Sequence, residues 1–253
     1  MFIQTVDKKK ALWFECDNNL NNNKSVLFLT GFPKYPWNTK FVDLFVRHWY
    51  NVLCPMYSWT FESNWRFSIE ESVLDIKLRY EFLSKWIIDL DILWKEKKKY
   101  NIEEIILCWV SYWWYILALF LDNYKAIKTQ KAFFISMLGY WFINKNNPSF
   151  IEWANNSKKL LEIAFPFSYR LKDINKFFNQ IKWVEKINIE QDTTLNCEIK
   201  KILIHWKNDL LTPINISEYY FKNHDNCILN PIDWWHASKM DMAEIENLIH
   251  KFS

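Results

Sequence analysis

Ser111 is the residue whose surroundings most clearly predict chemistry. It lies between the apolar run EIILC, residues 104–108, which predicts a buried strand, and a further apolar stretch that predicts a helix. A serine on a sharp turn between a strand and a helix exposes its hydroxyl, and the unpaired N–H groups at the helix N-terminus favour developing negative charge. Such a serine is suited to nucleophilic attack on a carbonyl carbon, provided that the residues two places before and after it are small.

The residues at those two places are Trp109 and Trp113, which carry the largest side chain of all. With glycine at Trp109, Trp113 and Trp114 the segment IILCWVSYWWY would become IILCGVSYGGY, which has the G-x-S-x-G pattern of a nucleophile elbow. As printed, the segment predicts an ordinary core or surface serine. The chemistry expected of Ser111 therefore depends on whether these tryptophans are genuine.

The tryptophan and glycine contents are both abnormal. The chain has 16 Trp and 2 Gly in 253 residues, and together they make up about 7% of the chain, the usual share of glycine alone. The chain is also rich in Asn, Lys and Ile, as the products of AT-rich coding sequences are. Some bacteria with such genomes read the codon UGA as glycine, whereas common translation tables for a reassigned UGA give tryptophan. We hypothesise that most Trp letters stand for UGA codons read as glycine.

A genuinely Trp-rich protein is the alternative, and the positions of the tryptophans argue against it. Glycine allows a positive φ and a close backbone approach, whereas tryptophan is poor in tight turns. Several tryptophans stand where a helix C-cap or a turn is expected, namely Trp49, Trp59, Trp65, Trp206, Trp234 and Trp235. The codon UGG at positions 109, 113, 206 and 235 would contradict the glycine hypothesis.

The elements around these turns predict an α/β fold. Short apolar runs predict strands at 26–30, 51–55, 104–108, 132–138, 201–205 and 227–231, after two short antiparallel strands that end near Cys16. Helical spacing and caps predict helices at 38–48, 68–85, after Ser111 and at 241–252. This alternation predicts a mostly parallel sheet with helices on both faces. We expect one domain, 1–253, in which residues 139–200 are inserted as a helical cap or lid.

These features together resemble the α/β-hydrolase family over nearly the whole chain. The resemblance implies the α/β-hydrolase fold, with Ser111 as nucleophile and a triad in the chain order Ser, acid, His. Asp209 in HWKNDLLTP and His236 in DWWHASK follow the two last predicted strands. The resemblance gives Asp209 the role of orienting the imidazole and His236 the roles of general base and then general acid.

The oxyanion hole that the resemblance implies consists of two backbone N–H groups. The family has His-Gly-x at the end of an early strand, and this chain has Thr30-Gly31-Phe32, with threonine in place of histidine. The expected donors are the N–H groups of Phe32 and Tyr112. Because backbone groups perform this role, the change at Thr30 weakens the motif more than the mechanism.

Other polar residues compete for these roles. Asp225 and Asp233 are alternative acids, and Asp209 is preferred because Asp233 lies on the same predicted loop as His236. His205, at the end of its predicted strand, is expected to be a structural histidine with a satisfied hydrogen bond.

The resemblance implies a serine hydrolase, and the segment GFP and the short chain favour an esterase or acyl hydrolase that acts on a small-molecule or peptide acyl substrate. The S-Y-G-G form of the elbow resembles the prolyl-oligopeptidase group, so a serine peptidase of the aminopeptidase or oligopeptidase type is the alternative. If the tryptophans are genuine, residues 105–120 predict a short membrane-spanning or interfacial helix. The chain would then be a membrane-associated or non-catalytic interaction protein.

The remaining composition excludes several classes of partner. The net charge of +3 and the scattered basic residues predict no nucleic-acid partner, and the lysine runs at 8–10 and 95–99 predict solvated loops or helix ends. Five widely spaced cysteines predict free thiols and no metal site. We expect no metal and no organic cofactor. The N-terminus lacks the pattern of a secretory signal, which predicts a cytoplasmic location.

Overall fold

The structure is a computed structural model of the chain. It describes residues 2–6, 9–16, 23–30, 40–56, 69–85, 87–89, 97–110, 116–117, 120–121, 124, 128–135, 148, 151–152, 155–156, 159, 162–163, 198–208, 214–223, 226–233 and 242–252.

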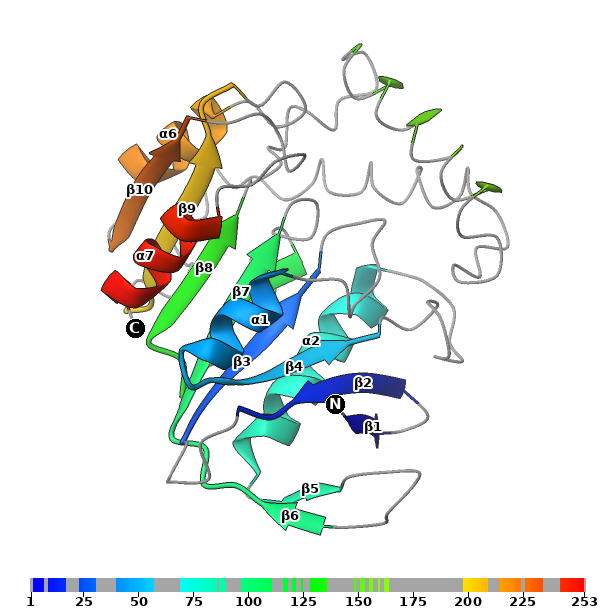
Figure 1. The fold of residues 1–253 in the computed structure, drawn as a ribbon. Helices are drawn as coiled ribbons and strands as arrows, with labels where there is room; N and C mark the ends of the chain where they lie inside the picture. The colour runs from blue at the N-terminus through cyan, green and yellow to red at the C-terminus, as the bar shows by residue number, and fades with distance from the viewer. Residues whose placement is uncertain are drawn as a thin grey trace.

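A central sheet of eight described strands confirms the predicted α/β class (Figure 1). The strands follow one another in the order β1-β2-β4-β3-β7-β8-β9-β10. Their bounds are β1 Phe2–Val6, β2 Lys9–Phe14, β3 Lys24–Leu29, β4 Asn51–Pro55, β7 Glu104–Val110, β8 Lys131–Ile135, β9 Lys200–Trp206 and β10 Cys227–Ile232.

The sheet is antiparallel only at its N-terminal edge. The hairpin β1–β2 pairs antiparallel, and β2 pairs antiparallel with β4. From β4 to β10 every described pair of neighbours is parallel. The predicted pair of N-terminal strands and the mostly parallel sheet are therefore both confirmed.

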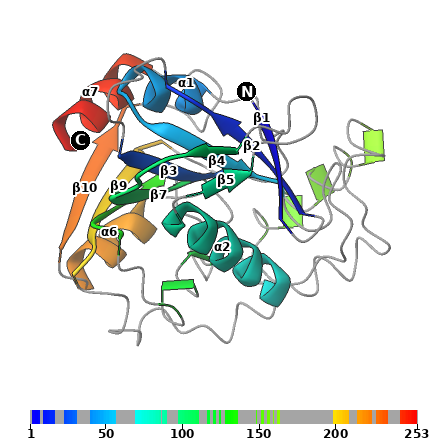
Figure 2. The ribbon, with the colours of Figure 1, turned by 90° about the horizontal axis from the view of Figure 1, so that it is seen from below.

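Helices cover both faces of the sheet (Figure 2). One face carries α1, Lys40–Arg47, and α7, Met242–Phe252. The opposite face carries α2, Ile69–Ser84, and α6, Asn215–Asn223. Because both faces are covered, the inner strands are buried nearly throughout: in β7 every residue after Glu104 is buried.

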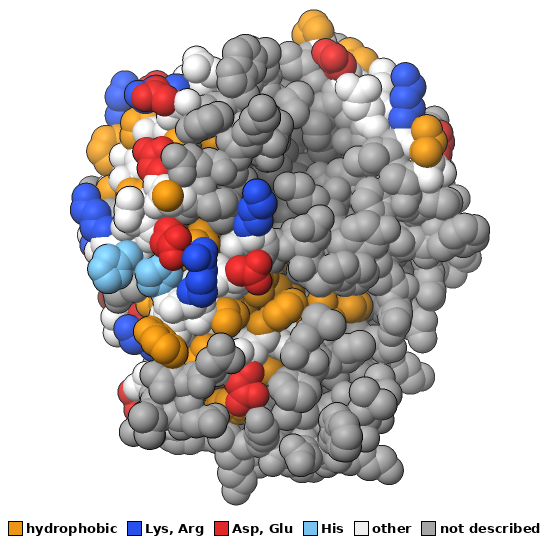
Figure 3. Space-filling model, viewed as in Figure 1, with side chains coloured by type: hydrophobic (Ala, Val, Ile, Leu, Met, Phe, Trp, Pro, Cys, Tyr) orange, Lys and Arg blue, Asp and Glu red, His pale blue; other side chains and the backbone are white. Residues whose placement is uncertain are grey.

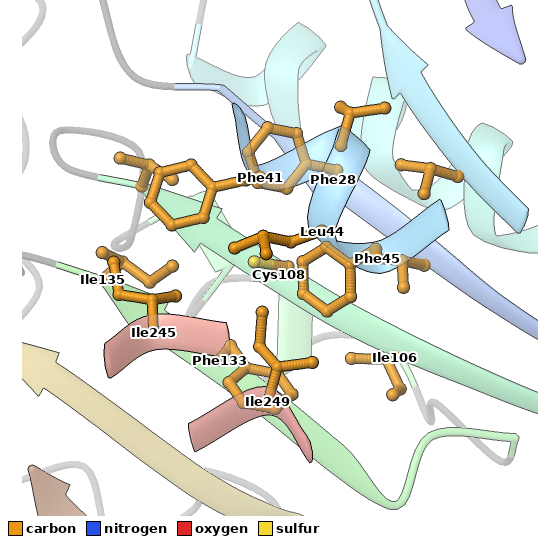
Figure 4. Packing of buried hydrophobic residues seen from close by; sticks show 14 of the residues in the cluster. Phe28, Phe41, Leu44, Phe45, Ile106, Cys108, Phe133, Ile135, Ile245 and Ile249 are labelled. Atoms are coloured by element: carbon orange, nitrogen blue, oxygen red, sulfur yellow. The ribbon is translucent and has the colours of Figure 1, made fainter. Parts of the chain in front are cut away.

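A hydrophobic core cluster lies between the sheet and the pair α1 and α7 (Figure 4). Phe41, Leu44 and Phe45 recur at helical spacing on α1, and they pack onto Phe28 and Cys108 of the strands below. Burial of each such large side chain stabilises the fold by about 1.5–3 kcal/mol. This core fixes α1 on the sheet.

The C-terminal end of α1 contacts α7 through charged and aromatic side chains. Glu246 lies 3.4 Å from Arg47 and 3.3 Å from His48, and the rings of His48 and His250 lie 5.7 Å apart. Figure 3 shows histidine side chains, in pale blue, side by side on the surface of the molecule. The contacts hold α7, the last described element, against α1.

Trp49 closes α1 in a conformation that favours glycine. Its φ is 65°, in the left-handed region. Its N–H donates to the carbonyl of Val46 at 3.1 Å, and the N–H of Tyr50 donates to the carbonyl of Phe45 at 3.0 Å. These two bonds form a Schellman motif, in which the residue with positive φ is most often glycine. Trp49 is 56% exposed, so packing gives little reason for a tryptophan here.

Of three further sequence expectations about elements, two are wrong and one is confirmed. The lysine runs, expected to be loops or helix ends, contribute to strands: Lys9 and Lys10 lie in β2, and residues 97–99 form β6, which pairs antiparallel with β5, Ile87–Asp89. The turn expected at Trp206 is confirmed, because the fully buried Trp206 is the last residue of β9 and a turn follows at residues 207 and 208. Residues 105–110 belong to the parallel strand β7, which rules out a membrane helix over 105–120. β-branched and apolar residues that neighbour other strands favour a sheet here.

The expected insertion lies between two neighbouring strands. β8 ends at Ile135, and β9, its parallel neighbour, begins at Lys200. The described residues within 148–163 are helical and lie apart from the sheet, on the side to which the parallel strands point (Figure 1). A cap or lid over 139–200 stays a prediction.

Candidate active site at the carboxyl edge of the sheet

The parallel strands end close together along one edge of the sheet. Leu29 of β3 is in register with Trp109 of β7, and Val110 is in register with Ile135 of β8. Further along the same edge, Ile135 is in register with Ile204 of β9. The carboxyl ends of parallel strands in an open α/β sheet form the place where ligands usually bind.

All five residues predicted for the site lie within four residues after the end of a parallel strand. Ser111 follows β7 without an intervening residue, Phe32 comes three residues after β3, Asp209 three residues after β9, and His236 four residues after β10. These residues and Tyr112 themselves lie outside the described residues. The structure thus describes the strands from which the predicted site residues extend, and the positions of their side chains remain predictions.

The connections that carry Asp209 and His236 start side by side. Trp206 of β9 is in register with Ile232 of β10, and the N–H of Lys207 donates to the carbonyl of Ile232 at 2.8 Å. The connections that follow β9 and β10 therefore leave the sheet next to each other.

Asp233, an alternative acid, is already paired at this point. Its Oδ1 lies 2.7 Å from Nζ of Lys207, and its side chain is 78% exposed. An exposed carboxylate held by a lysine is poorly placed to orient a buried imidazole. Asp225 lies outside the described residues, before the start of β10, whereas His236 follows the end of that strand.

His205, expected to be structural, has a buried partner. Its Nδ1 lies 2.6 Å from Oγ of Ser217, a residue of α6 that no sequence motif singles out. Helical spacing alone gave no signal for Ser217, since a serine in a helix is ordinarily exposed.

The buried cysteines of β4 and β7, Cys54 and Cys108, are unreactive. Burial raises the pKa of Cys54 and Cys108, and for Cys108 the nearby Cys54 raises it further. Both thiols therefore stay protonated at neutral pH and are weak nucleophiles. Cys16, Cys54, Cys108 and Cys227 are free, as expected from their spacing.

Trp109, two residues before Ser111, lies within the described part of the chain. It is fully buried in β7, and its indole N–H has no hydrogen-bond acceptor within the described part of the chain. A buried donor without an acceptor costs about 1–3 kcal/mol.

Within the described ranges, no group of three or more His, Cys, Asp or Glu residues is placed to hold a metal ion. No described helix is both long and apolar enough to cross a membrane.

Solved structures with the same arrangement cover almost the whole chain. Est1E from Butyrivibrio proteoclasticus matches with a TM-score of 0.68 at 15% identity, over 100% of this chain and 96% of its own. The chain has the α/β-hydrolase fold. At this identity the similarity shows the fold alone.

Two further solved structures also match over nearly the whole chain. MGS-MChE2, an α/β-hydrolase enzyme from the metagenome of lagoon sediments at Mar Chica, Morocco, has a TM-score of 0.61 at 16% identity, over 99% of this chain and 96% of its own. A monoacylglycerol lipase from Paleococcus ferrophilus has a TM-score of 0.63 at 13% identity, over 96% of this chain and 97% of its own. No protein-family model matches the sequence, and no curated protein matches it.

Proposed function

We propose that this α/β-hydrolase fold is a serine hydrolase that cleaves a carboxylic ester or a related acyl bond. Ser111 is the nucleophile, His236 the general base and acid, and Asp209 the residue that orients the imidazole. The observation that carries the proposal is that Ser111 immediately follows the buried inner strand β7, while the connections bearing Asp209 and His236 begin side by side on β9 and β10.

The distances along the sheet allow these residues to meet. β7 and β10 are three strand spacings apart, which is roughly 14 Å at about 4.8 Å per spacing. The four residues from Ile232 to His236 can span up to about 14 Å before the length of the imidazole is added. Asp209 starts from the neighbouring strand, so it can reach the same histidine.

The proposed reaction has two steps. His236 accepts the proton of the Ser111 hydroxyl as its oxygen attacks the substrate carbonyl, and the same histidine then protonates the leaving group as the acyl-enzyme forms. Water then attacks the acyl-enzyme, again giving its proton to His236, and Ser111 is restored with release of the acid.

The backbone N–H groups of Phe32 and Tyr112 are proposed to hold the oxyanion. Phe32 follows Leu29 of β3 by three residues, and Tyr112 follows Trp109 of β7 by three residues. Leu29 and Trp109 are in register. Two N–H groups that extend equally far from neighbouring strands can converge on one oxygen. One such donor is worth about 10²–10³ in kcat.

An ester substrate is preferred to a peptide. The Paleococcus ferrophilus protein, which matches this chain in structure, is a monoacylglycerol lipase. A small-molecule acyl substrate and a cytoplasmic location remain proposals drawn from the sequence, as does the absence of a cofactor.

We further propose that residues 49, 109 and 113 are glycine in the protein that the source organism makes. Trp49 has the left-handed φ that glycine adopts without strain, and glycine at Trp109 would remove a buried indole N–H that has no acceptor within the described residues. Glycine at Trp109 and Trp113 would complete the elbow around Ser111. The mass of the peptides covering these positions, in protein from its own organism, tests this directly: tryptophan masses would overturn it.

The function is tested with a glycine version of the chain, which carries glycine at Trp49, Trp109, Trp113 and Trp235. We expect it to hydrolyse p-nitrophenyl esters, and we expect Ser111→Ala to lower kcat by about 10⁴-fold or more. Turnover of aminoacyl arylamides in preference to esters would instead indicate a peptidase. Full ester turnover by Ser111→Ala would refute the proposed nucleophile.

A further inference from the structure

His205 and Ser217 form a hydrogen bond that is closed to solvent. His205 Nδ1 lies 2.6 Å from Ser217 Oγ, and the two residues are 0% and 1% exposed. The strand neighbours of His205, Ile204 and Trp206, belong to the core cluster beneath α1 and α7. Because side chains alternate along a strand, His205 points to the opposite face, which α6 covers (Figure 2).

The burial of this pair decides between two roles. A serine hydroxyl beside an imidazole resembles a nucleophile with its base, but a substrate cannot reach an oxygen that is closed to solvent. The two groups do satisfy each other, and a buried imidazole or hydroxyl without a partner would be costly. The pair is therefore suited to holding two elements together.

The two elements are the ends of the connection that carries Asp209. This connection, residues 207–214, runs from the end of β9 to the start of α6. At its start the N–H of Lys207 donates to the carbonyl of Ile232, and at its end the N–H of Glu218 donates to the carbonyl of Ile214 at 3.0 Å. The bond between His205 and Ser217 joins the two ends directly.

We propose that His205 and Ser217 are positioning residues, whose hydrogen bond fixes the connection 207–214 and thereby the place of Asp209 relative to β10. This inference rests on the proposed function, because it assigns the pair a role through Asp209. A displacement of about 1 Å in a catalytic group can cost about 10²-fold in rate. Loss of the bond thus lowers kcat and leaves KM nearly unchanged, since neither side chain contacts substrate.

Steady-state kinetics of Ser217→Ala in the glycine version tests this role. We expect kcat to fall about 10–100-fold with KM within about twofold, and Ser217→Thr, which keeps the hydroxyl, to recover most of kcat. When Asp209→Asn is already present, Ser217→Ala is expected to lower kcat by less than about twofold, because both changes act through one group. An unchanged kcat, or the same loss with and without Asp209→Asn, overturns the inference.

Hydrogen exchange, measured in the chain that keeps all its tryptophans, gives a readout that does not depend on activity. Ser217→Ala is expected to speed exchange of the backbone amides in 207–214 and to leave those of β7 unchanged. Unchanged exchange in 207–214 overturns the inference even if Ser111 is the nucleophile. If Ser217→Ala unfolds the chain, Ser217→Cys replaces it, since a thiol fills the site with a weaker hydrogen bond. Full ester turnover by Ser111→Ala refutes the proposed function separately.

Discussion

The backbone N–H of Lys207 lies 2.8 Å from the carbonyl oxygen of Ile232, so the connections bearing Asp209 and His236 leave the sheet from hydrogen-bonded neighbours. This bond continues the register of β9 and β10 by one residue beyond Trp206. An acid and a base on these two connections can meet without any long excursion of the chain.

Asp209→Asn and Asp233→Asn are expected to differ sharply in activity. Asparagine at Asp209 removes the charge that stabilises the imidazolium, and kcat for ester hydrolysis should fall about 10⁴-fold. Asp233 is exposed and paired with Lys207, so Asp233→Asn should change kcat less than about threefold and stability by about 0.2–1 kcal/mol. Steady-state kinetics of the two variants in the glycine version measures the contrast, and the reverse order of effects would make Asp233 the acid.

Trp49→Gly is expected to stabilise the chain relative to Trp49→Ala by about 1 kcal/mol. Both changes remove the same indole, but alanine keeps a Cβ that is unfavourable at a φ of 65°. In an ordinary helical position glycine would instead be the less stable residue of the two. Urea unfolding of the two variants gives the difference in the free energy of unfolding.

Asn226→Gly provides the matched control for this comparison. Asn226 also has a positive φ, 57°, but asparagine tolerates that region well. The change should therefore give a smaller gain than the step from alanine to glycine at residue 49. Equal stability of Trp49→Gly and Trp49→Ala would show that the left-handed C-cap does not require glycine.

The free energy of unfolding is expected to fall as the pH rises from 8.5 to 9.5. Burial raises the pKa of Cys54 and Cys108 in the folded chain, so near pH 9 only the unfolded chain loses these protons. Below the unfolded thiol pKa of about 8.5 both states are protonated and the effect is absent. The two thiols together should cost about 2 kcal/mol across this interval.

The double variant Cys54→Ala, Cys108→Ala isolates the contribution of the two thiols. Its free energy of unfolding should change with pH by about 2 kcal/mol less than that of the parent between pH 8.5 and 9.5. The pH interval ends at 9.5, below the ordinary tyrosine pKa of about 10. Burial also raises the pKa of Tyr80, which would contribute to the pH dependence above that value. The same pH slope in parent and variant would contradict a buried, protonated pair of thiols.

The sequence predicted the parallel part of the sheet well because its strands are short continuous apolar runs. β4 lies at Asn51–Pro55 as expected, and α7 begins within one residue of its predicted start. Such runs are typical of strands covered on both faces, and they leave few alternatives. The fold class follows from their alternation with helices.

The parts that could not be predicted depend on contacts between segments distant in sequence. Residues 97–99 are all lysine, and only pairing with β5 makes them a strand. No helix was predicted at α6, and the proposed role of Ser217 follows only from the packing of α6 beside His205.

The central claim is most directly tested by covalent labelling with a fluorophosphonate probe. Such a probe phosphonylates an activated serine, so peptide mass spectrometry of the labelled glycine version should find one adduct, on the peptide that contains Ser111. His236→Gln should abolish that adduct, because the hydroxyl then lacks its base. An adduct on a different serine, or labelling that persists in Ser111→Ala, would contradict the assignment of Ser111 as the nucleophile.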